Sequence, residues 1–404
     1  MVGSAREWPQ TLDISAIMAD GWHPVPFRDF IVKIHSRCDL ACDHCYIYEM
    51  ADQSWRGQPR RMSGEIATRA AFRIGEHARD HRLADVNLIL HGGEPLLAGH
   101  DLIRKLVTET RKQAGPDVRV QVGVQTNAVG LDEAYLRLFR DLGVMVGISI
   151  DGDAEAHDRH RRFKSGRGSY EAVSAALDRL RDSRFRHLFG GLLCTIDLHN
   201  DPLTTYEALI GFDPPRIDFL LPHGTWDSRP PGRSADARHT PYADWLIAIF
   251  DRWYADPRTR IRLFEEIMHL ILGRMAEGEA VGLAPARMVV IETDGSIEQV
   301  DTLKSVHDGA SWTGLHVSRD PLDDALSLPG IVARQIGEMA LSAQCRRCPV
   351  HQVCGGGMYA HRYRSGSGFA NPSVYCPDLM LLIRHVHTVM RADIDTRIHR
   401  RTLT

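Results

Sequence analysis

Strand-like and helix-like runs alternate through the first half of this 404-residue chain, and this alternation constrains its fold more than any other feature. The expected strands span residues 30–35, 86–91, 118–125, 144–150, 187–196 and 217–221, with amphipathic runs at 64–81, 101–113, 132–142 and 170–181 between them. Mostly apolar strands that alternate with helices pair in parallel beneath a helical layer. The sequence therefore predicts an α/β fold with a partial (β/α)6 barrel similar to a TIM barrel.

Turns with chemically useful side chains follow four of these strands. They are a cysteine-bearing loop after residue 35, the turn 91–94 (His-Gly-Gly-Glu), the turn 125–127 (Gln-Thr-Asn) and the turn 149–151 (Ser-Ile-Asp). Barrel enzymes of the α/β class carry their chemistry at the carboxyl ends of the strands. We therefore expect these four turns to meet at one functional face.

The first cysteine group is Cys38, Cys42 and Cys45, spaced C-x3-C-x2-C, and no further cysteine follows until Cys194. Iron–sulfur cubes are normally closed by four thiolates, so three thiolates leave one iron open to a small ligand. Half of a zinc site is the alternative, but zinc pairs usually have a second pair nearby. The spacing favours a cluster with one open iron. Cys194 lies in an apolar strand and is expected to be a buried free thiol.

A second cysteine group lies in the last third of the chain, at Cys345, Cys348, Cys354 and Cys376. Four thiolates can close either a fully ligated iron–sulfur cluster or a structural zinc site. The spacing of these cysteines alone does not distinguish an iron–sulfur cluster from a zinc ion.

The net charge of −3 offers no general attraction for nucleic acid or for an anionic membrane. No apolar stretch approaches the ~20 residues that a membrane span needs, and the amino-terminus lacks a signal-peptide layout. We therefore expect a cytoplasmic protein without nucleic-acid or membrane partners. In a reducing compartment, eight cysteines favour metal or cluster ligation over disulfides.

Changes of pattern along the chain divide it into four expected parts. These are a leading segment at 1–25, the barrel at 26–240, a helical bridge at 241–286 and a C-terminal module at 287–404. Within the module, Asp294-Gly295 is a strong hairpin turn signal, and a basic amphipathic helix is expected near the end of the chain.

The cysteine triplet, followed by the turn Gly92-Gly93-Glu94-Pro95, resembles the radical S-adenosylmethionine (SAM) superfamily. The resemblance implies a [4Fe–4S] cluster whose open iron chelates SAM, and a one-electron cleavage of SAM to a 5′-deoxyadenosyl radical. It also implies SAM-binding roles for His44 near adenine, for Gly92, Gly93 and Glu94 near the methionine group, and for Ser149 and Arg161. Gln125 and Asn127 are expected either to line the pocket or to make strand-end hydrogen bonds.

The second cysteine group resembles the SPASM extension of peptide-modifying radical SAM enzymes. That resemblance implies auxiliary [4Fe–4S] clusters. The resemblance also implies cysteines near the 294–301 hairpin and just beyond Cys354, but this sequence has none there. Val300 and Asp301 occupy the positions in the hairpin where a cysteine would be expected. The four cysteines present are enough to close one auxiliary cluster. The expected fold is thus a radical SAM barrel with a SPASM/twitch-type α+β iron–sulfur module.

Longer segments narrow the resemblance to FxsB-type peptide maturases. They are residues 31–50, 219–232, 295–303 and 354–379. This family implies a ribosomally made precursor peptide, a carbon–carbon cyclophane link from an aromatic ring to a β-carbon, and a reducing partner such as flavodoxin or ferredoxin. We expect Asp227 to be the base that removes the ring proton. The alternatives are a sulfatase-type formylglycine or thioether-forming maturase and, in another class, a non-enzymatic metal- or haem-handling scaffold.

Overall fold

A single ten-stranded sheet forms the centre of the molecule, in the order β10-β9-β8-β1-β2-β3-β4-β5-β6-β7. The computed structural model describes residues 7–276 and 278–402. The strands are β1 (Asp29–His35), β2 (Asp85–Gly92), β3 (Arg119–Thr126), β4 (Val144–Ser149), β5 (Phe189–Thr195), β6 (Arg216–Leu220), β7 (Arg260–Ile261), β8 (Met288–Ile291), β9 (Ser296–Glu298) and β10 (Trp312–His316). Every neighbouring pair from β8 through β7 is parallel, whereas β9 and β10 run antiparallel to their neighbours.

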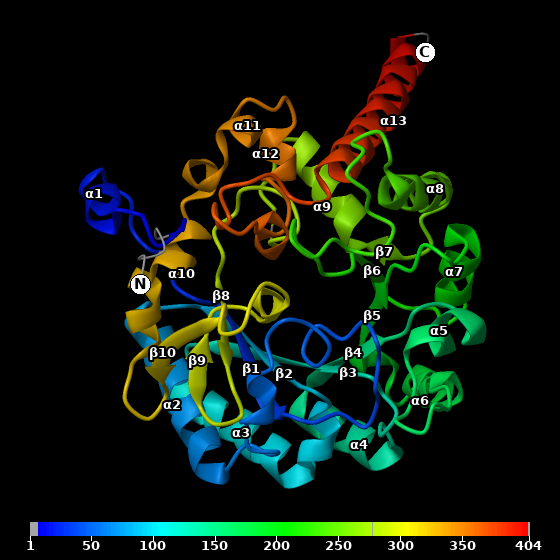
Figure 1. The fold of residues 1–404 in the computed structure, drawn as a ribbon. Helices are drawn as coiled ribbons and strands as arrows, with labels where there is room; N and C mark the ends of the chain where they lie inside the picture. Colours follow the sequence, from blue (N-terminus) through cyan, green and yellow to red (C-terminus); the bar gives the residue numbers. More distant parts are fainter. Residues whose placement is uncertain (1–6, 277, 403–404) are drawn as a thin grey trace.

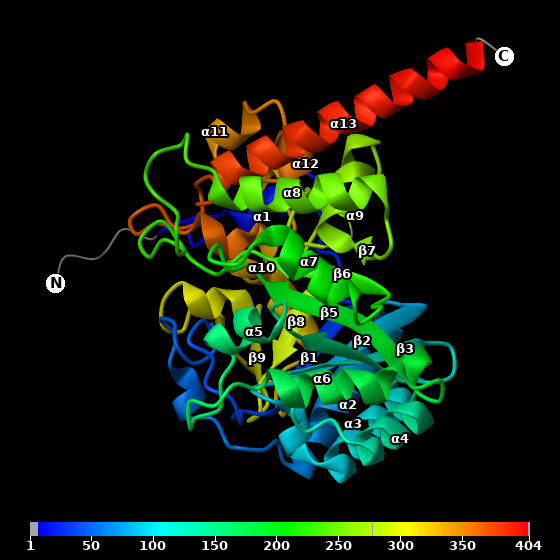
Figure 2. The same cartoon turned by 90° about the vertical axis from the view of Figure 1, so that its right-hand side faces the viewer.

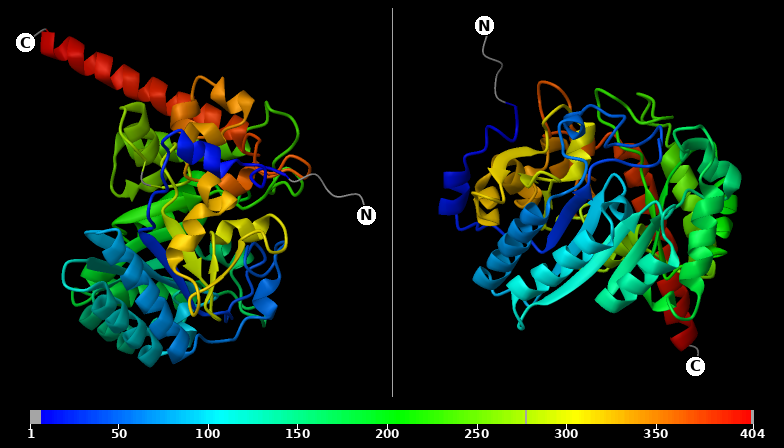
Figure 3. Two further views of the ribbon diagram at one scale, coloured as in Figure 1. Left: turned by 90° about the vertical axis from the view of Figure 1, so that its left-hand side faces the viewer. Right: turned by 90° about the horizontal axis from the view of Figure 1, so that it is seen from below.

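Helices cover the outer face of the curved sheet, as the view from below shows (Figure 3). The covering helices are α2 (Gly64–Asp80), α3 (His100–Ala114), α4 (Glu133–Leu142) and α6 (Tyr170–Arg181). Local signals start two of them, because Ser63 accepts a hydrogen bond from Ile66 N at the start of α2 and Asp132 accepts one from Tyr135 N at the start of α4. Their apolar stripes bury against the strands and make one continuous core. The expected α/β fold with parallel strands is confirmed.

Within the barrel, two short helices occur where no helix is expected from the sequence, α5 (Ala154–His160) and α7 (Pro202–Ile210). Each spans few residues, too few for a strong periodic pattern. Capping starts both of them, since Asp153 accepts a hydrogen bond from Ala156 N and Asp201 accepts one from Thr204 N. Helix α5 leaves the carboxyl end of β4 and therefore borders the face where the polar turns meet.

The C-terminal module continues the barrel sheet. Strand β8 pairs in parallel with β1, with Asp29 opposite Met288, and the β8–β9 hairpin turns at Asp294-Gly295 as expected. The expected boundary at 287 thus falls just before a strand of the same sheet, and the four-part division stays a prediction. The module and bridge contain α8 (Pro241–Ala255), α9 (Arg262–Ile271), α10 (Pro329–Ala333), α11 (Ala343–Arg346), α12 (His351–Cys354) and α13 (Cys376–Thr402).

Helix α13 begins beside α11 and α12 and extends away from the body (Figures 1 and 2). Single turns of 3-10 helix connect the longer elements. They are Ser54–Arg56, Pro95–Ala98, Arg186–Leu188, Asp301–Ser305, Leu322–Ser327, Gly337–Ala340 and Tyr359–Arg362. None of the helices in the described ranges is both long and apolar enough to span a membrane.

The leading segment lies against the C-terminal module. Residues 1–6 of the expected 1–25 segment lie outside the described residues. Around the short helix α1 (Ile14–Ala19), apolar side chains of the segment pack on Val332, Ile336 and Ala340. The Trp8 carbonyl accepts a hydrogen bond from the Phe369 amide at 3.3 Å.

Candidate functional site

The loop that carries the first cysteine group is anchored by the Gly-Gly-Glu turn after β2. The Gly93 amide donates to the His35 carbonyl at 2.8 Å, and the Glu94 amide donates to the Arg37 carbonyl at 3.0 Å. A Cβ on Gly92, which has φ +145°, would lie 2.1 Å from the His35 carbonyl oxygen. A Cβ on Gly93 would lie 1.9 Å from the Tyr48 hydroxyl. Glycine is therefore required at both positions because the two loops approach each other closely. From the sequence, these glycines were expected to allow close approach of a ligand instead.

All three cysteines of this loop are partly buried and carry no disulfide. The Cys38 sulfur receives hydrogen bonds from Leu40 N at 3.4 Å and from Asn127 Nδ2 at 3.5 Å, which are donors suited to a thiolate. Burial raises the pKa of all three thiols, that of Cys42 to about 11. Ionised sulfur in this loop therefore needs a positive partner, which a bound metal supplies.

The spacing of the sulfurs fits a cluster better than a single zinc ion. A tetrahedral zinc site with Zn–S bonds of about 2.3 Å brings its sulfurs within about 4 Å of one another. Among the described residues, neither cysteine group is one of the sets whose ligand atoms all lie within 4.8 Å of one another. The sulfurs of neither group are thus drawn together as in a zinc site, and the all-cysteine donor sets fit an iron–sulfur cluster.

Glu94 is fully enclosed behind the cysteine loop, with 1% of its surface exposed. Its carboxylate accepts hydrogen bonds from Leu96 N at 2.9 Å, Thr126 Oγ1 at 2.7 Å and Asn127 N at 2.8 Å. Burial outweighs these donors and raises the pKa of Glu94 to about 7. Glu94 thus joins the turn after β2 to the end of β3, and its expected role toward the SAM amino group stays a prediction.

Three expected pocket residues meet one another or the cysteine loop. Gln125 Nε2 donates to Ser149 Oγ at 2.9 Å, across the paired strands β3 and β4. Asn127 Nδ2 donates to Asp39 Oδ1 at 2.7 Å, and its Oδ1 accepts from Val129 N. Both readings of Gln125 and Asn127 stay open, because the strand-end hydrogen bonds are present and Asn127 also touches the Cys38 sulfur.

Arg161 and His44 meet at a buried carboxylate. Arg161 Nε donates to Asp151 Oδ2 at 2.6 Å and Nη2 donates to Oδ1 at 3.2 Å, a bidentate pair. His44 Nε2 lies 3.9 Å from the same Oδ2, and burial together with Arg161 lowers the pKa of His44 to about 4. His44 is therefore a neutral ring at pH 7, as stacking on adenine would require. The expected contacts of Arg161 and His44 with SAM stay predictions.

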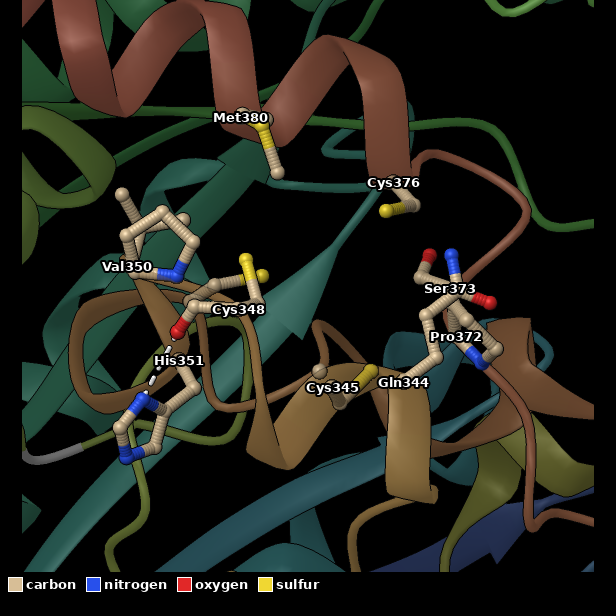
Figure 4. Close-up of a pocket in the computed structure, with 12 residues that line it drawn as sticks. Gln344, Cys345, Cys348, Val350, His351, Pro372, Ser373, Cys376 and Met380 are labelled. Atoms are coloured by element: carbon tan, nitrogen blue, oxygen red, sulfur yellow. Dashed lines mark hydrogen bonds between the residues drawn. The ribbon is translucent and has the colours of Figure 1, made fainter.

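The second cysteine group surrounds a cavity of about 230 Å³ between α11, α12 and the start of α13. Figure 4 shows Cys345, Cys348 and Cys376 around a shared space, with Met380 above it; Cys354 also lines the cavity. A water-sized occupant needs only about 10–15 Å³, so the space suits a group much larger than one ion. Burial raises the pKa of Cys354 to about 12 and that of Cys376 to about 11, so these sulfurs too need a cationic partner.

A buried set of charges stands where the hairpin lacks cysteines, and sequence reasoning missed it. The set contains Lys33 on β1, Glu292 after β8, Glu298 on β9, and Asp301 and Lys304 on the following 3-10 turn. Their side chains are at most 5% exposed. The signals in the sequence were a lysine inside an apolar strand and charged residues alternating along a short hairpin.

Asp227 does not lie with these groups. It is exposed, and its Oδ2 accepts hydrogen bonds from Ser365 N at 2.8 Å and Ser365 Oγ at 2.6 Å. The carboxylate thus ties the loop after β6 to a loop of the C-terminal module. Its expected role as a catalytic base finds no support in this placement.

Residues 32–203 match the family model described as the Radical SAM superfamily. The three-cysteine loop, the Gly-Gly-Glu turn and strands β2 to β5 all lie within these residues, so this part of the chain is similar to that superfamily. The expected SAM and [4Fe–4S] cofactors agree with this match.

The relatives that match most of the chain are more specific. The "Serine-type anaerobic sulfatase-maturating enzyme" of Klebsiella aerogenes is 25% identical over 362 residues, which cover 87% of this chain and 84% of that enzyme. The "Cysteine-type anaerobic sulfatase-maturating enzyme" of Clostridium novyi is 22% identical over 274 residues, which cover 66% of this chain and 71% of that enzyme.

Solved structures show the same fold. The structure described as "Native anSMEcpe with bound AdoMet and Cp18Cys peptide" aligns with a TM-score of 0.77 at 20% identity, and covers 92% of this chain and 99% of that chain. SuiB of Streptococcus suis, "bound to precursor peptide SuiA", aligns with a TM-score of 0.59 at 12% identity, and covers 90% of this chain and 78% of that one. These likenesses confirm the barrel with its C-terminal module.

The expectation of a cyclophane-forming, FxsB-type maturase is wrong. Several relatives that match the chain along most of its length are sulfatase-maturating enzymes, which correspond to the alternative reading. The cysteine loop and the C-terminal module occur in maturases that use the same radical to form different products. These motifs therefore do not identify the product that is formed. A flavodoxin or ferredoxin partner stays a prediction.

Proposed function

We propose that this chain is a radical SAM maturase that oxidises a serine or cysteine side chain of a protein or peptide substrate to formylglycine. The similarity to sulfatase-maturating enzymes over 87% of the chain carries the proposal. Relatives of both the serine and the cysteine type match, so both substrate residues remain candidates. The fold shared with a peptide-bound structure supports a peptide segment as the form in which the substrate enters.

The residues present fit the cofactors that this function needs. Cys38, Cys42 and Cys45 would hold the cluster with its open iron, and the four cysteines around the cavity of about 230 Å³ would hold a second cluster. When bound, SAM supplies a 5′-deoxyadenosyl radical that removes a hydrogen atom from the substrate β-carbon. The neutral imidazole of His44 and the Arg161–Asp151 pair border this site and bring no unpaired charge to it.

Oxidation of the side chain also requires loss of a proton from its oxygen or sulfur and of one further electron, which the second cluster would accept. A cysteine would first give a C=S group, which water converts to the aldehyde with release of sulfide. We assign proton removal to Asp301, because it is 3% exposed and its Oδ2 lacks a hydrogen-bond partner among the described residues. Its charge acts on Tyr46, which follows Cys45, and on His91 and His223. The action of this charge on Tyr46 supports a position of the Asp301 carboxylate near the cysteine loop, and Asp301 is buried whereas Asp227 is exposed.

Mass spectrometry of a peptide product tests the proposal. Anaerobically reconstituted enzyme, SAM and a reductant are incubated with matched sulfatase-type peptides that carry serine, cysteine or alanine at the target position. We expect one of the first two to gain an aldehyde that reacts with a hydrazide probe, and the alanine peptide to stay unchanged. Active SAM cleavage without aldehyde on either peptide would contradict the assignment.

A further inference from the structure

The buried charges beside the β8–β9 hairpin form one connected ion cluster. Lys33 Nζ lies 2.7 Å from Glu292 Oε1 and 2.6 Å from Asp301 Oδ1. Lys304 Nζ lies 3.1 Å from the same Glu292 oxygen and 2.8 Å from Glu298 Oε2. Three of the carboxylates come close enough to hold a metal ion, but the two ammonium groups already stand among them. Protein cations thus supply the positive charge here.

The two lysines do different work in this ion cluster. Both ammonium groups contact Glu292, but Lys33 is the one that contacts Asp301, whereas Lys304 contacts Glu298 and lies 3.9 Å from Asp52. Asp52 is itself held by Ser54 and by the Gly309 amide at 2.8 Å. Lys304 therefore neutralises Glu298 and shares Glu292 with Lys33, and Lys33 is the ammonium paired with Asp301.

The position of Lys33 matters because a lone buried carboxylate takes up a proton and can no longer accept one. Burial of a carboxylate favours its neutral form, whereas an adjacent cation favours its ionised form. Burial alone would lower the pKa of Lys33, but Asp301 and Glu292 outweigh it and raise that pKa well above its usual value. The ammonium is thus a permanent charge beside Asp301. The charged and titratable groups around Asp301 are Lys33, Tyr46, His91, His223, Glu292, Glu298 and Lys304.

We propose that Lys33 is a positioning residue, whose ammonium pairs with Asp301 and orients its carboxylate for proton removal from the substrate. The proposal rests on the proposed function and deepens it. The proton passes from the oxygen or sulfur of the substrate to a carboxylate oxygen of Asp301, while Lys33 keeps its own protons. Lys304, equally buried in the same cluster, does not share this role.

The test compares Lys33→Met with Lys304→Met in the reconstituted enzyme, with peptide oxidation followed across pH. Removal of the ammonium beside Asp301 should move the acid limb of the rate profile to higher pH by about one unit or more. Lys304→Met should lower the unfolding temperature by a similar amount but move the limb much less. An unmoved limb in Lys33→Met, or equal movement in both variants, would overturn the proposal.

Two further measurements separate a positioning role from a structural one. The double variant Lys33→Met/Asp301→Asn leaves neither charge unpaired, so it should regain unfolding temperature without regaining peptide oxidation. Recovery of oxidation would overturn the proposal. The pH dependence of unfolding can be measured without substrate. In Lys33→Met, a buried carboxylate without its ammonium partner stays protonated in the folded state but ionises in the unfolded chain. The free energy of unfolding of Lys33→Met should therefore fall, relative to wild type, as pH rises above about 4. An unchanged pH dependence of unfolding would also overturn the proposal. This measurement remains informative even if the wild-type enzyme oxidises no peptide and the proposed function fails.

Discussion

Asp301 begins a 3-10 turn and Asp227 lies in a loop, and burial gives these two aspartates different chemistry. Asp301 is enclosed beside the Lys33 ammonium, and one of its oxygens has no hydrogen-bond partner among the described residues. Asp227 is exposed, and two hydrogen bonds from Ser365 occupy its carboxylate. A general base must reach the proton that it accepts, and the charge of Asp301 acts on Tyr46, the neighbour of Cys45.

Substitution of each aspartate by asparagine separates the two. We expect Asp301→Asn to slow peptide oxidation by at least about 10²-fold, the usual contribution of a positioned base, while SAM cleavage continues. Asp227→Asn should oxidise peptide at the wild-type rate, because it alters a surface contact. Aldehyde yield and 5′-deoxyadenosine yield, measured in the same reactions, check both outcomes. Equal losses in the two variants would remove Asp301 from the mechanism.

The cysteines allow an equally direct comparison at the residue scale. Cys42→Ala removes one of three ligands of the first cluster, whereas Cys194→Ala changes a thiol that is 1% exposed and lies within β5. We expect Cys42→Ala to lose SAM cleavage and about half of the bound iron, because each cube holds four iron atoms. Cys194→Ala should keep both. Iron and sulfide analysis with visible absorbance provides the measurement, and full iron content in Cys42→Ala would argue against a cluster there.

At the scale of elements, the loops at the carboxyl ends of the strands bring the site together. Backbone hydrogen bonds join the turn after β2 to the cysteine loop, and Glu94 joins the same turn to the end of β3. The joint between β4 and α5 depends on His157, which is fully buried. Its Nδ1 accepts from Asp151 N at 3.3 Å and its Nε2 lies 2.9 Å from Ser169 Oγ.

This joint predicts a loss of stability in mild acid. Burial lowers the pKa of His157 to about 4, below the ~6.5 of an unfolded histidine. Its contribution is therefore complete above pH ~6.5 and is lost progressively as pH falls toward 4, because the unfolded chain binds the proton first. Thermal unfolding from pH 7.5 to pH 4.5 should fall more steeply in wild type than in His157→Gln. Parallel curves would contradict this role.

Elements with a strong local pattern could be predicted from the sequence. The six expected strands and the helices α2, α3, α4 and α6 all appear within a few residues of their expected limits, because each has a clear apolar period and several have a capping residue. Helices α5 and α7 were missed because they are short. The cysteine groups could be recognised because thiolate spacing is itself the chemical signal.

The ion cluster could not be predicted in this way. Lys33 and Glu292 are 259 positions apart in the sequence, and they meet only because β8 pairs with β1. Each charged residue alone is most simply read as a solvated side chain. The substrate was also misread, because the motifs shared by radical SAM maturases fix the radical and not its later fate.

At the scale of the whole molecule, one continuous sheet and its helical cap carry two separate cysteine groups. The first lies on the loop after β1, and the second lies between α11, α12 and α13 (Figure 1). We predict two [4Fe–4S] clusters and hence about eight iron atoms per chain. Cys376→Ala should lose about half of the iron yet still cleave SAM. Stoichiometric zinc in place of that iron would show that the second group is a structural zinc site.

Transfer of deuterium from a labelled substrate tests the proposed function most directly. A peptide with deuterium on the β-carbon of its target serine or cysteine is incubated with the reconstituted enzyme and unlabelled SAM. If the enzyme abstracts this hydrogen, 5′-deoxyadenosine carries one deuterium and forms in proportion to the aldehyde product. Unlabelled 5′-deoxyadenosine throughout, with no aldehyde on either peptide, would contradict a formylglycine-forming radical SAM maturase.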